Sequence, residues 1–252
     1  VGVVTNVGPV HLEGVGGLAG VAAAKAEILE GIAPGGAVVL NADDPLVLKM
    51  AAYTESKHLC YVTTNPAHEL VREHIRAGGR ACALEAGVNG QMITLYDRGG
   101  HIPLVWTHLI PATLEGRAMH NVQNAMFAAA MAFSLGIKLD AIRQGLRTFD
   151  STFYQAPGRM NVFDEHPFKV LFDYGHNAHA VSMMADLAQR LDVVEQPAAV
   201  GEHELDFVGP FDDVVIGDDV AFLRQYTQPV VLADPSGAAT RPISGSSLSS
   251  LK

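Results

Sequence analysis

Residues 37–45 read AVVLNADDP, an apolar run followed by an asparagine, two adjacent acids and a proline. The apolar run predicts a short buried strand, and the polar residues after it predict the turn into a helix. Working outward, the spacing of apolar residues predicts helices over 18–32 and 46–52 and a strand over 1–5. Strand, helix, strand, helix in succession is typical of a parallel sheet covered by helices. We therefore expect an α/β fold.

The composition excludes several classes of protein. Of the 252 residues, 48% are hydrophobic and 17% are charged, which allows a large core and excludes disorder for most of the length. A net charge of -10 without a long basic run argues against nucleic acid or a polybasic membrane anchor as partner. We find no signal peptide and no apolar run of the ~18 residues that a membrane span needs. Cys60 and Cys82 form no CxxC motif, which argues against a structural zinc site. Two cysteines without such a pattern favour a reducing, cytoplasmic location.

The middle of the sequence changes its period. Short strand-like runs, with Asn89-Gly90 between two of them, predict a hairpin-rich insert from Leu59 to Arg117. Helices are expected over 121–135, 139–146 and 180–191, and strands over 169–172 and 211–216. An irregular stretch at 149–157 predicts a boundary, so we expect domains at 1–152 and 153–234 and a flexible tail at 235–252. Because residue 1 already lies in a strand, we expect the first domain to be truncated at its N-terminal side.

Two candidate residues belong to the first half of the chain. His11 follows the first strand in a loop rich in turn formers, at the sheet edge where ligands of open α/β sheets bind. It could reach a metal or a phosphate, or be an ordinary surface histidine. Lys25 lies within an alanine-rich helix, where it either extends to solvent or takes part in chemistry.

The segment HNVQN at 120–124 opens a long helix. Asn121 is a suitable N-cap, and Asn124 projects beside it from the first turn. A side-chain amide can pair its donor and acceptor with the edge of an adenine base. Capping alone accounts for one of the two asparagines.

Polar residues also cluster beyond the boundary. Arg159 follows a Pro-Gly turn, and its planar guanidinium suits a phosphate or carboxylate unless it is an ordinary exposed arginine. Asp173, Tyr174 and His176 follow an apolar strand. An acid at this place commonly accepts from a ribose hydroxyl, and the histidine could face a phosphate. The alternative is that Asn177 caps the following helix and that Asp173, Tyr174 and His176 bind nothing.

In this order, the motifs resemble those of the Mur ligase superfamily, which are ATP-dependent amide ligases. Over residues 1–190 the sequence is most similar to the ligase half of the cyanophycin synthetases. The resemblance implies part of a nucleotide-binding central domain, followed by a smaller Rossmann-like domain, with ATP between them. It also implies a reaction in which ATP phosphorylates a carboxyl group and an amine attacks the acyl phosphate.

The resemblance further implies roles for individual residues. Lys25, which some relatives carbamylate, and His176 would be catalytic, and His11 and Lys25 would hold Mg²⁺. The nucleotide would be bound by five residues: Asn121, Asn124, Arg159, Asp173 and Tyr174. Of these, Asn124 would contact adenine, Asp173 the ribose, and Arg159, with His176, the phosphates. The implied partners are ATP, aspartate, arginine and a cyanophycin-like peptide primer, and the implied full-length enzyme is a homo-oligomer.

Three departures from the family pattern leave alternatives open. No GxxxxGK[ST] phosphate-binding loop occurs, and Val10 stands where an acid usually precedes the histidine. After Leu191 the expected Gly-rich strand–turn–helix is missing. We therefore expect a ligase segment that is inactive alone. The alternatives are another ligase of the superfamily, or a non-catalytic module that binds nucleotide weakly or assembles with partner chains.

Overall fold

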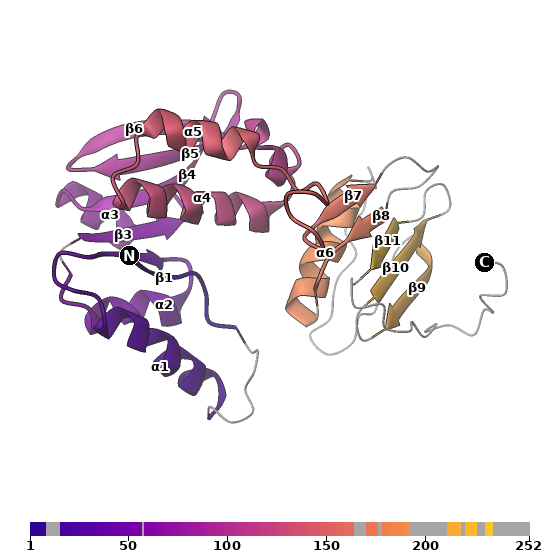
Figure 1. Ribbon diagram of the computed structural model, residues 1–252, viewed down its shortest axis with the longest axis horizontal. Helices are drawn as coiled ribbons and strands as arrows, with labels where there is room; N and C mark the ends of the chain where they lie inside the picture. The colour runs from indigo at the N-terminus through magenta and orange to yellow at the C-terminus, as the bar shows by residue number, and fades with distance from the viewer. Residues whose placement is uncertain are drawn as a thin grey trace. The chain divides into compact units, whose positions relative to one another are not determined.

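The computed structural model describes residues 1–8, 16–56, 58–163, 170–175, 178–191, 211–217, 220–225 and 230–233. The chain divides into two compact units, Val1–Phe149 and Asp150–Lys252, each with its own sheet (Figure 1). We call them unit 1 and unit 2.

The sheet of unit 1 has six strands in the order in which they occur along the chain. They are β1 (Gly2–Val4), β2 (Ala37–Asn41), β3 (His58–Thr63), β4 (Arg80–Gly87), β5 (Gly90–Asp97) and β6 (Gly100–Trp106). The strands from β1 to β4 are parallel, whereas β4, β5 and β6 pair antiparallel. The parallel sheet and the hairpin at Asn89-Gly90 are thus confirmed, and Gly90 has a φ of 112°, which glycine adopts without strain.

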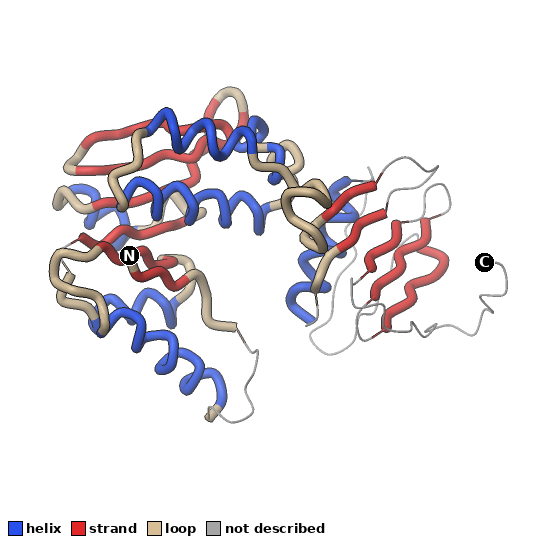
Figure 2. Tube along the Cα trace, viewed as in Figure 1, coloured by secondary structure: helices blue, strands red, loops and turns tan. Residues whose placement is uncertain are grey.

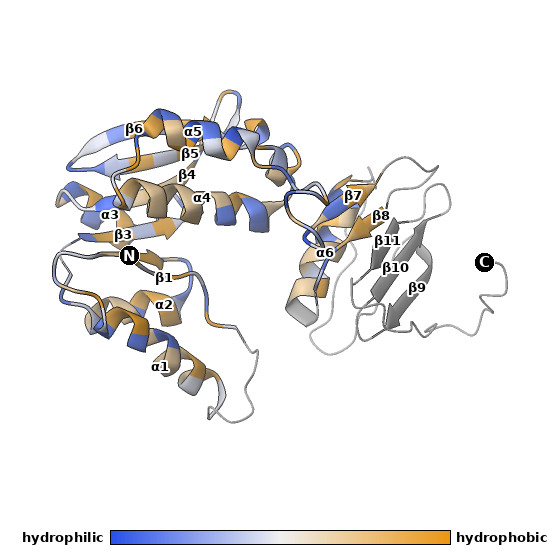
Figure 3. Ribbon diagram, in the orientation of Figure 1, coloured by the Kyte–Doolittle hydropathy of each residue, from blue (hydrophilic) through white to orange (hydrophobic). Residues whose placement is uncertain are grey.

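Helices cover both faces of this sheet (Figures 1 and 2). One face carries α1 (Gly17–Glu30), α2 (Pro45–Lys49) with a 3₁₀ turn (Met50–Tyr53), and α3 (Glu69–Arg76). The other carries α4 (Met119–Ser134) and α5 (Leu139–Thr148), reached through short 3₁₀ turns at Thr107–Leu109 and Pro111–Thr113. Figure 3 shows α4 as mostly hydrophobic, whereas α5 has a hydrophobic and a hydrophilic side. This difference matches their burial, because α4 has six buried residues whereas α5 buries only Ile142 and leaves a polar side to solvent.

The parallel strands are buried on both faces. All five residues of β2 are buried, with Val39 in the cluster beneath α4 and Leu40 in the cluster beneath α1 and α2. Cys60 and Cys82 are free and fully buried in β3 and β4. Burial raises the pKa of Cys60 to about 12 and raises that of Cys82 well above its ordinary value. Both thiols therefore stay protonated and pack as small apolar groups.

Two expectations for unit 1 are wrong. The hairpin region does not begin at Leu59, because β3 pairs in parallel with β2, and α3 connects β3 to a parallel β4. Apolar runs look alike in parallel and antiparallel strands, so the pairing depended on α3, which the sequence analysis left unassigned. Asn121 is not an N-cap, because α4 begins at Met119 and its N-cap residue is Ala118.

Unit 2 has a five-stranded mixed sheet in the order β7-β8-β11-β10-β9. Its elements are β7 (Asn161–Phe163), β8 (Val170–Phe172), α6 (Ala178–Leu191), β9 (Phe211–Gly217), β10 (Val220–Gln225) and β11 (Val230–Ala233). The strands expected at 169–172 and 211–216 and the helix at 180–191 are confirmed. Only β8 and β11 pair in parallel among these strands, so a Rossmann-like unit stays a prediction. The tail at 235–252 lies outside the described residues.

None of the helices in the described ranges is long and apolar enough to cross a membrane.

Candidate functional site

Side chains from α1, from the end of β2 and from the N-cap of α2 form hydrogen bonds to the backbone that follows β1. Asn41 donates from Nδ2 to the carbonyl of residue 5, and Lys25 donates from Nζ to the carbonyl of residue 6, both at 2.7 Å. The Oδ2 atom of Asp44 accepts from the amide of residue 7, also at 2.7 Å. We call Lys25, Asn41 and Asp44 the loop clamp. It fixes the first residues of the loop that leads on to His11.

The NADDP segment has the residue types that this arrangement needs. Asn41 offers both a donor and an acceptor, and its Oδ1 also accepts from the amide of Asp43 at 2.9 Å. Asp44 caps α2, since its Oδ1 accepts from the amides of Leu46 and Val47 at 2.8 and 3.2 Å. Pro45 then occupies the first turn of the helix, where its missing N–H is not needed. The sequence analysis assigned this segment only the turn from a strand into a helix.

Asp43 joins the ends of two neighbouring strands. Its Oδ2 accepts from the amide and the hydroxyl of Thr64, both at 2.7 Å, and its Oδ1 accepts from the hydroxyl of Thr63. These hydrogen bonds connect the carboxyl ends of β2 and β3. Both acids of the segment are thus already engaged with the protein.

The described residues do not by themselves form a Mg²⁺ site. Magnesium prefers oxygen ligands in octahedral geometry, and a lysine ammonium cannot coordinate a cation. Within the described ranges, no group of three His, Cys, Asp or Glu side chains is arranged to hold a metal. His11 lies outside the described residues. Lys25 would need to be carbamylated, and to give up its bond to the carbonyl of residue 6, before it could offer an oxygen.

The two asparagines of α4 lie together on its first turns. Asn121 donates from Nδ2 to the carbonyl of Ala112 at 2.7 Å, which ties α4 to the preceding 3₁₀ turn. Asn124 is exposed and donates from Nδ2 to Oδ1 of Asn121 at 3.1 Å. The Oδ1 of Asn124 has no hydrogen bond to any described residue. Asn121 therefore orients Asn124, whose amide remains able to meet the edge of a base.

In unit 2 the structure brings three of the predicted residues together. Asp173 accepts from the amide of Met160 at 2.8 Å through Oδ2. The guanidinium carbon of the exposed Arg159 lies 5.1 Å from the ring centroid of Tyr174, a cation–π contact. The stacked guanidinium keeps its N–H groups available for an anion, and Oδ1 of Asp173 has no hydrogen bond among the described residues. His176 lies outside the described residues.

Asn161, which the sequence analysis missed, shapes the turn that carries Arg159. Its buried side chain accepts from the amide of Gly158 at 2.8 Å and donates to the carbonyls of Ser151 and Ala156 at 2.6 and 2.9 Å. The only signal in the sequence was an asparagine just after the Pro-Gly-Arg turn, a common place for side-chain-to-backbone bonds.

The candidate residues thus form separate groups. Lys25 lies on α1 and Asn124 on α4, helices that cover opposite faces of the unit 1 sheet. Arg159, Asp173 and Tyr174 belong to unit 2.

Comparison with known proteins identifies the family. The model of the Mur ligase middle domain matches residues 1–132, so the chain belongs to the Mur ligase family. Within it, the chain is similar to the cyanophycin synthetase of Synechocystis sp., with 34% identity over 232 residues that cover 87% of this chain and 26% of the relative. The UDP-N-acetylmuramoyl-tripeptide--D-alanyl-D-alanine ligase of Escherichia coli is 33% identical over 72% of this chain and 36% of its own length.

A solved structure of MurF from Acinetobacter baumannii matches with a TM-score of 0.49 and 24% identity, over 73% of this chain and 36% of that one. The chain spans about a quarter of the length of the cyanophycin synthetases it matches.

Proposed function

We propose that this chain is a segment of an ATP-dependent amide ligase of the cyanophycin synthetase type, which adds aspartate and arginine to a growing peptide. The observation that carries the proposal is the identity and the coverage of the similarity taken together. The family model ends at residue 132, but the 34% identity to a cyanophycin synthetase covers 87% of the chain. The ligase from Escherichia coli has similar identity over a smaller share of the chain, 72%.

In the proposed reaction, a carboxylate oxygen attacks the terminal phosphoryl group of ATP, and ADP leaves. The amine of the incoming amino acid then attacks the carbonyl carbon of the acyl phosphate. An amide bond forms, inorganic phosphate leaves, and a base accepts the proton of the amine. We assign His176 to catalysis, and His11 and Lys25 to Mg²⁺, as predictions on which no step above depends. Because Lys25 is bonded to the loop that leads to His11, we also propose that it positions that loop.

We propose the nucleotide contacts that the resemblance implies, and the atoms left without a described hydrogen bond in three residues support them. Asn124, held by Asn121, offers Oδ1 to the amino group of adenine. Asp173 offers Oδ1 to a ribose hydroxyl, while its Oδ2 holds the backbone at Met160. Arg159, stacked on Tyr174, offers its N–H groups to the phosphates. We propose that unit 1 and unit 2 correspond to the central and C-terminal domains of a Mur ligase. We also propose that the protein is cytoplasmic and that its full-length form is a homo-oligomer.

Calorimetry with Mg-ATP tests the nucleotide assignment. We expect the 252-residue chain to bind weakly, because it contains no GxxxxGK[ST] loop. In a longer chain that supplies such a loop, Asn124→Ala should weaken ATP binding by about 1–3 kcal/mol, the cost of an unpaired buried partner. Gln123→Ala is the matched control on the same helix. Low-micromolar binding by the 252-residue chain would contradict the first expectation, and an unchanged affinity of Asn124→Ala would contradict the second.

An assay of ADP release by the longer chain also distinguishes the proposed ligase from the alternative functions. We expect ADP release that depends on aspartate or arginine together with a peptide primer. ATP binding without such release would favour a non-catalytic module, and release with other acceptors alone would favour another ligase of the family.

A further inference from the structure

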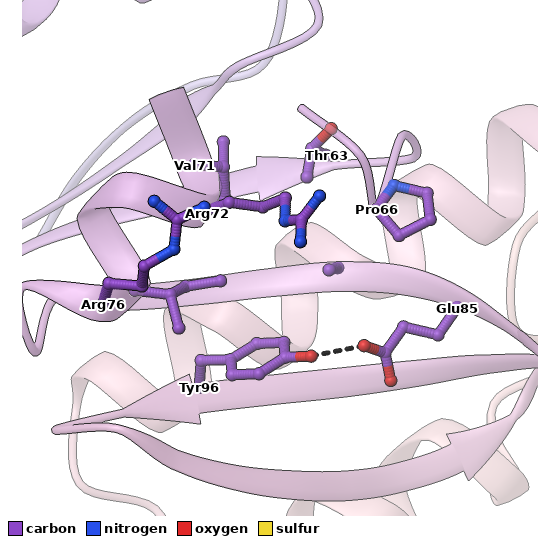
Figure 4. Close-up of a pocket in the computed structure, with 9 residues that line it drawn as sticks. Thr63, Pro66, Val71, Arg72, Arg76, Glu85 and Tyr96 are labelled. Atoms are coloured by element: carbon purple, nitrogen blue, oxygen red, sulfur yellow. Dashed lines mark hydrogen bonds between the residues drawn. The ribbon is translucent and has the colours of Figure 1, made fainter. Parts of the chain in front are cut away.

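A pocket of about 390 Å³ lies in unit 1, between α3 and the face of the sheet at β4 and β5 (Figure 4). None of the residues assigned above to nucleotide or metal lines it. Its base includes Val71 and Ala83, which are buried. The small side chain of Ala83 leaves room beneath the helix, and the volume is within the range of small-molecule sites, about 300–1,000 Å³.

Two arginines form the helical wall of this pocket. Arg72 and Arg76 are one helical turn apart on α3, are exposed, and extend from the same side of the pocket in Figure 4. Neither guanidinium has a hydrogen bond or an ion pair with any described residue, although Glu69 and Glu73 lie on the same helix. Like charges at this spacing disfavour a helix, and a protein of net charge -10 has many acids that could have neutralised them. Two free guanidiniums at a pocket suit a carboxylate or phosphate.

The opposite wall carries a fixed negative charge. Glu85 on β4 accepts from the hydroxyl of Tyr96, from the Thr94 hydroxyl at 2.7 Å and from Nε2 of His101 at 2.9 Å. Partial burial acts to raise the pKa of Glu85, but the hydrogen bonds from Tyr96, His101 and Thr94 outweigh it and lower the pKa. The carboxylate therefore stays ionised, and three bonds leave one of its roughly four acceptor positions open.

The two walls together select the ligand. A polyanion that filled the pocket would place negative charge against Glu85, and an apolar molecule would leave the two guanidiniums without a partner. A molecule with separated charges of both signs satisfies both walls. We propose that this pocket binds a zwitterion of amino-acid or short-peptide size, with its carboxylate on Arg72 and Arg76 and its cationic end toward Glu85. The proposal goes beyond the ligase function proposed above and does not rest on it.

Calorimetry with L-arginine on the 252-residue chain tests the proposal. Two analogues each remove one charge: L-citrulline replaces the guanidinium with a neutral group of similar shape, and L-arginine methyl ester lacks the carboxylate. We expect each analogue to bind at least about tenfold more weakly than L-arginine, since each loses a charge-assisted hydrogen bond. Inorganic phosphate, which carries no cation, should also bind more weakly.

Variants of the chain locate the binding. Arg72→Gln and Arg76→Gln change exposed side chains, so the protein should stay folded, and each should weaken L-arginine at least about tenfold. Glu85→Gln should weaken L-arginine more than L-citrulline, because only L-arginine has a second cation, the side-chain guanidinium, that can reach Glu85 while its carboxylate lies on the arginines. Arg147→Gln, at an exposed arginine of α5, is the matched control and should change nothing.

The proposal is overturned if L-arginine does not bind, or if its binding survives both Arg72→Gln and Arg76→Gln unchanged. It is also overturned if phosphate binds as tightly as L-arginine, since the pocket would then be a simple anion site, or if L-citrulline does, since no side-chain cation would then lie against Glu85. Arg72→Gln should leave Mg-ATP binding unchanged, so failure here and failure of the nucleotide assignment are distinguishable.

Discussion

The two halves of the unit 1 sheet place their polar side chains differently. In the parallel half, β1 to β4, helices cover both faces, β2 is buried along its whole length, and the polar groups lie beyond the strand ends. In the antiparallel half, β4 to β6, helices α4 and α5 cover one face, and the other carries Glu85, Thr94 and Tyr96.

The difference follows from how the strands are connected. A parallel connection needs a crossover helix, which covers a face of the sheet, whereas a hairpin needs only a tight turn. In the parallel half, polar side chains that could bind a ligand are therefore restricted to the carboxyl ends of the strands and the loops that follow them, as at the loop clamp. In the antiparallel half, a sheet face is left for a polar network and a pocket.

The largest expected effect tests the parallel half. Leu40 on β2 is 0% exposed, and Leu40→Ala should lower the free energy of unfolding by about 2–5 kcal/mol through lost burial and a cavity. Urea denaturation measures this. Val88→Ala, at a hairpin side chain that is 98% exposed, is the control and should stay within about 0.5 kcal/mol. Similar small effects in both variants would contradict a parallel half that is packed on both faces.

The next effect tests the polar face of the antiparallel half. Glu85→Gln removes the charge that receives three hydrogen bonds and leaves at least one donor unpaired. We expect the free energy of unfolding to fall by about 1–3 kcal/mol in urea denaturation. Glu55→Gln, at an exposed glutamate, should have no measurable effect. Equal stability of both variants would show that the network of Glu85 contributes nothing.

A smaller effect is expected at the loop clamp. Asp44→Ala removes the cap of α2 and the acceptor for the amide of Val7. We expect a loss of about 0.5–2 kcal/mol in the free energy of unfolding, typical of a lost N-cap. Hydrogen exchange should also become faster at the amide of Val7, whereas the amides of β5 should not change. Unchanged exchange at Val7 would mean that Asp44 serves α2 alone.

The smallest effect is a dependence on pH. Because hydrogen bonding lowers the pKa of Glu85 in the folded protein, its contribution is fully present above the carboxyl's unfolded pKa of about 4.3. It is lost as the pH falls through the lower folded value. The stability difference between the wild type and Glu85→Gln should therefore shrink as the pH is lowered through this range. A difference that stays constant would contradict a lowered pKa for Glu85.

Much of the secondary structure could be predicted because it depends on local patterns. The strand at 37–41, the hairpin at Asn89-Gly90 and the helix at 139–148 each follow from periodicity or turn chemistry within a few residues. The helix at Glu69–Arg76 was missed because most of its side chains are charged or histidine, with only a narrow apolar side toward the sheet. Without that helix, the parallel pairing of β3 and β4 could not be predicted.

The candidate site was predictable in its residue types but not in its partners. Asn124, Arg159 and Asp173 were proposed from motifs, because base edges, phosphates and ribose hydroxyls each require particular donors and acceptors, and their roles stay predictions. The roles of Asn41 and Asp44 were not, since each bonds to a residue more than thirty positions earlier in the chain.

By itself, the sequence determined the α/β class, the hairpin and the polar segments that follow the strands, since each depends on residues close together in the chain. Only the tertiary structure decided that Lys25 and Asp44 hold the same loop, that Asn121 supports Asn124 rather than capping its helix, and that Arg72 and Arg76 share a pocket with Glu85. The physical reason is that side-chain hydrogen bonds and pockets depend on which strands lie side by side. That order is set by the burial of the whole core, not by any local run of residues.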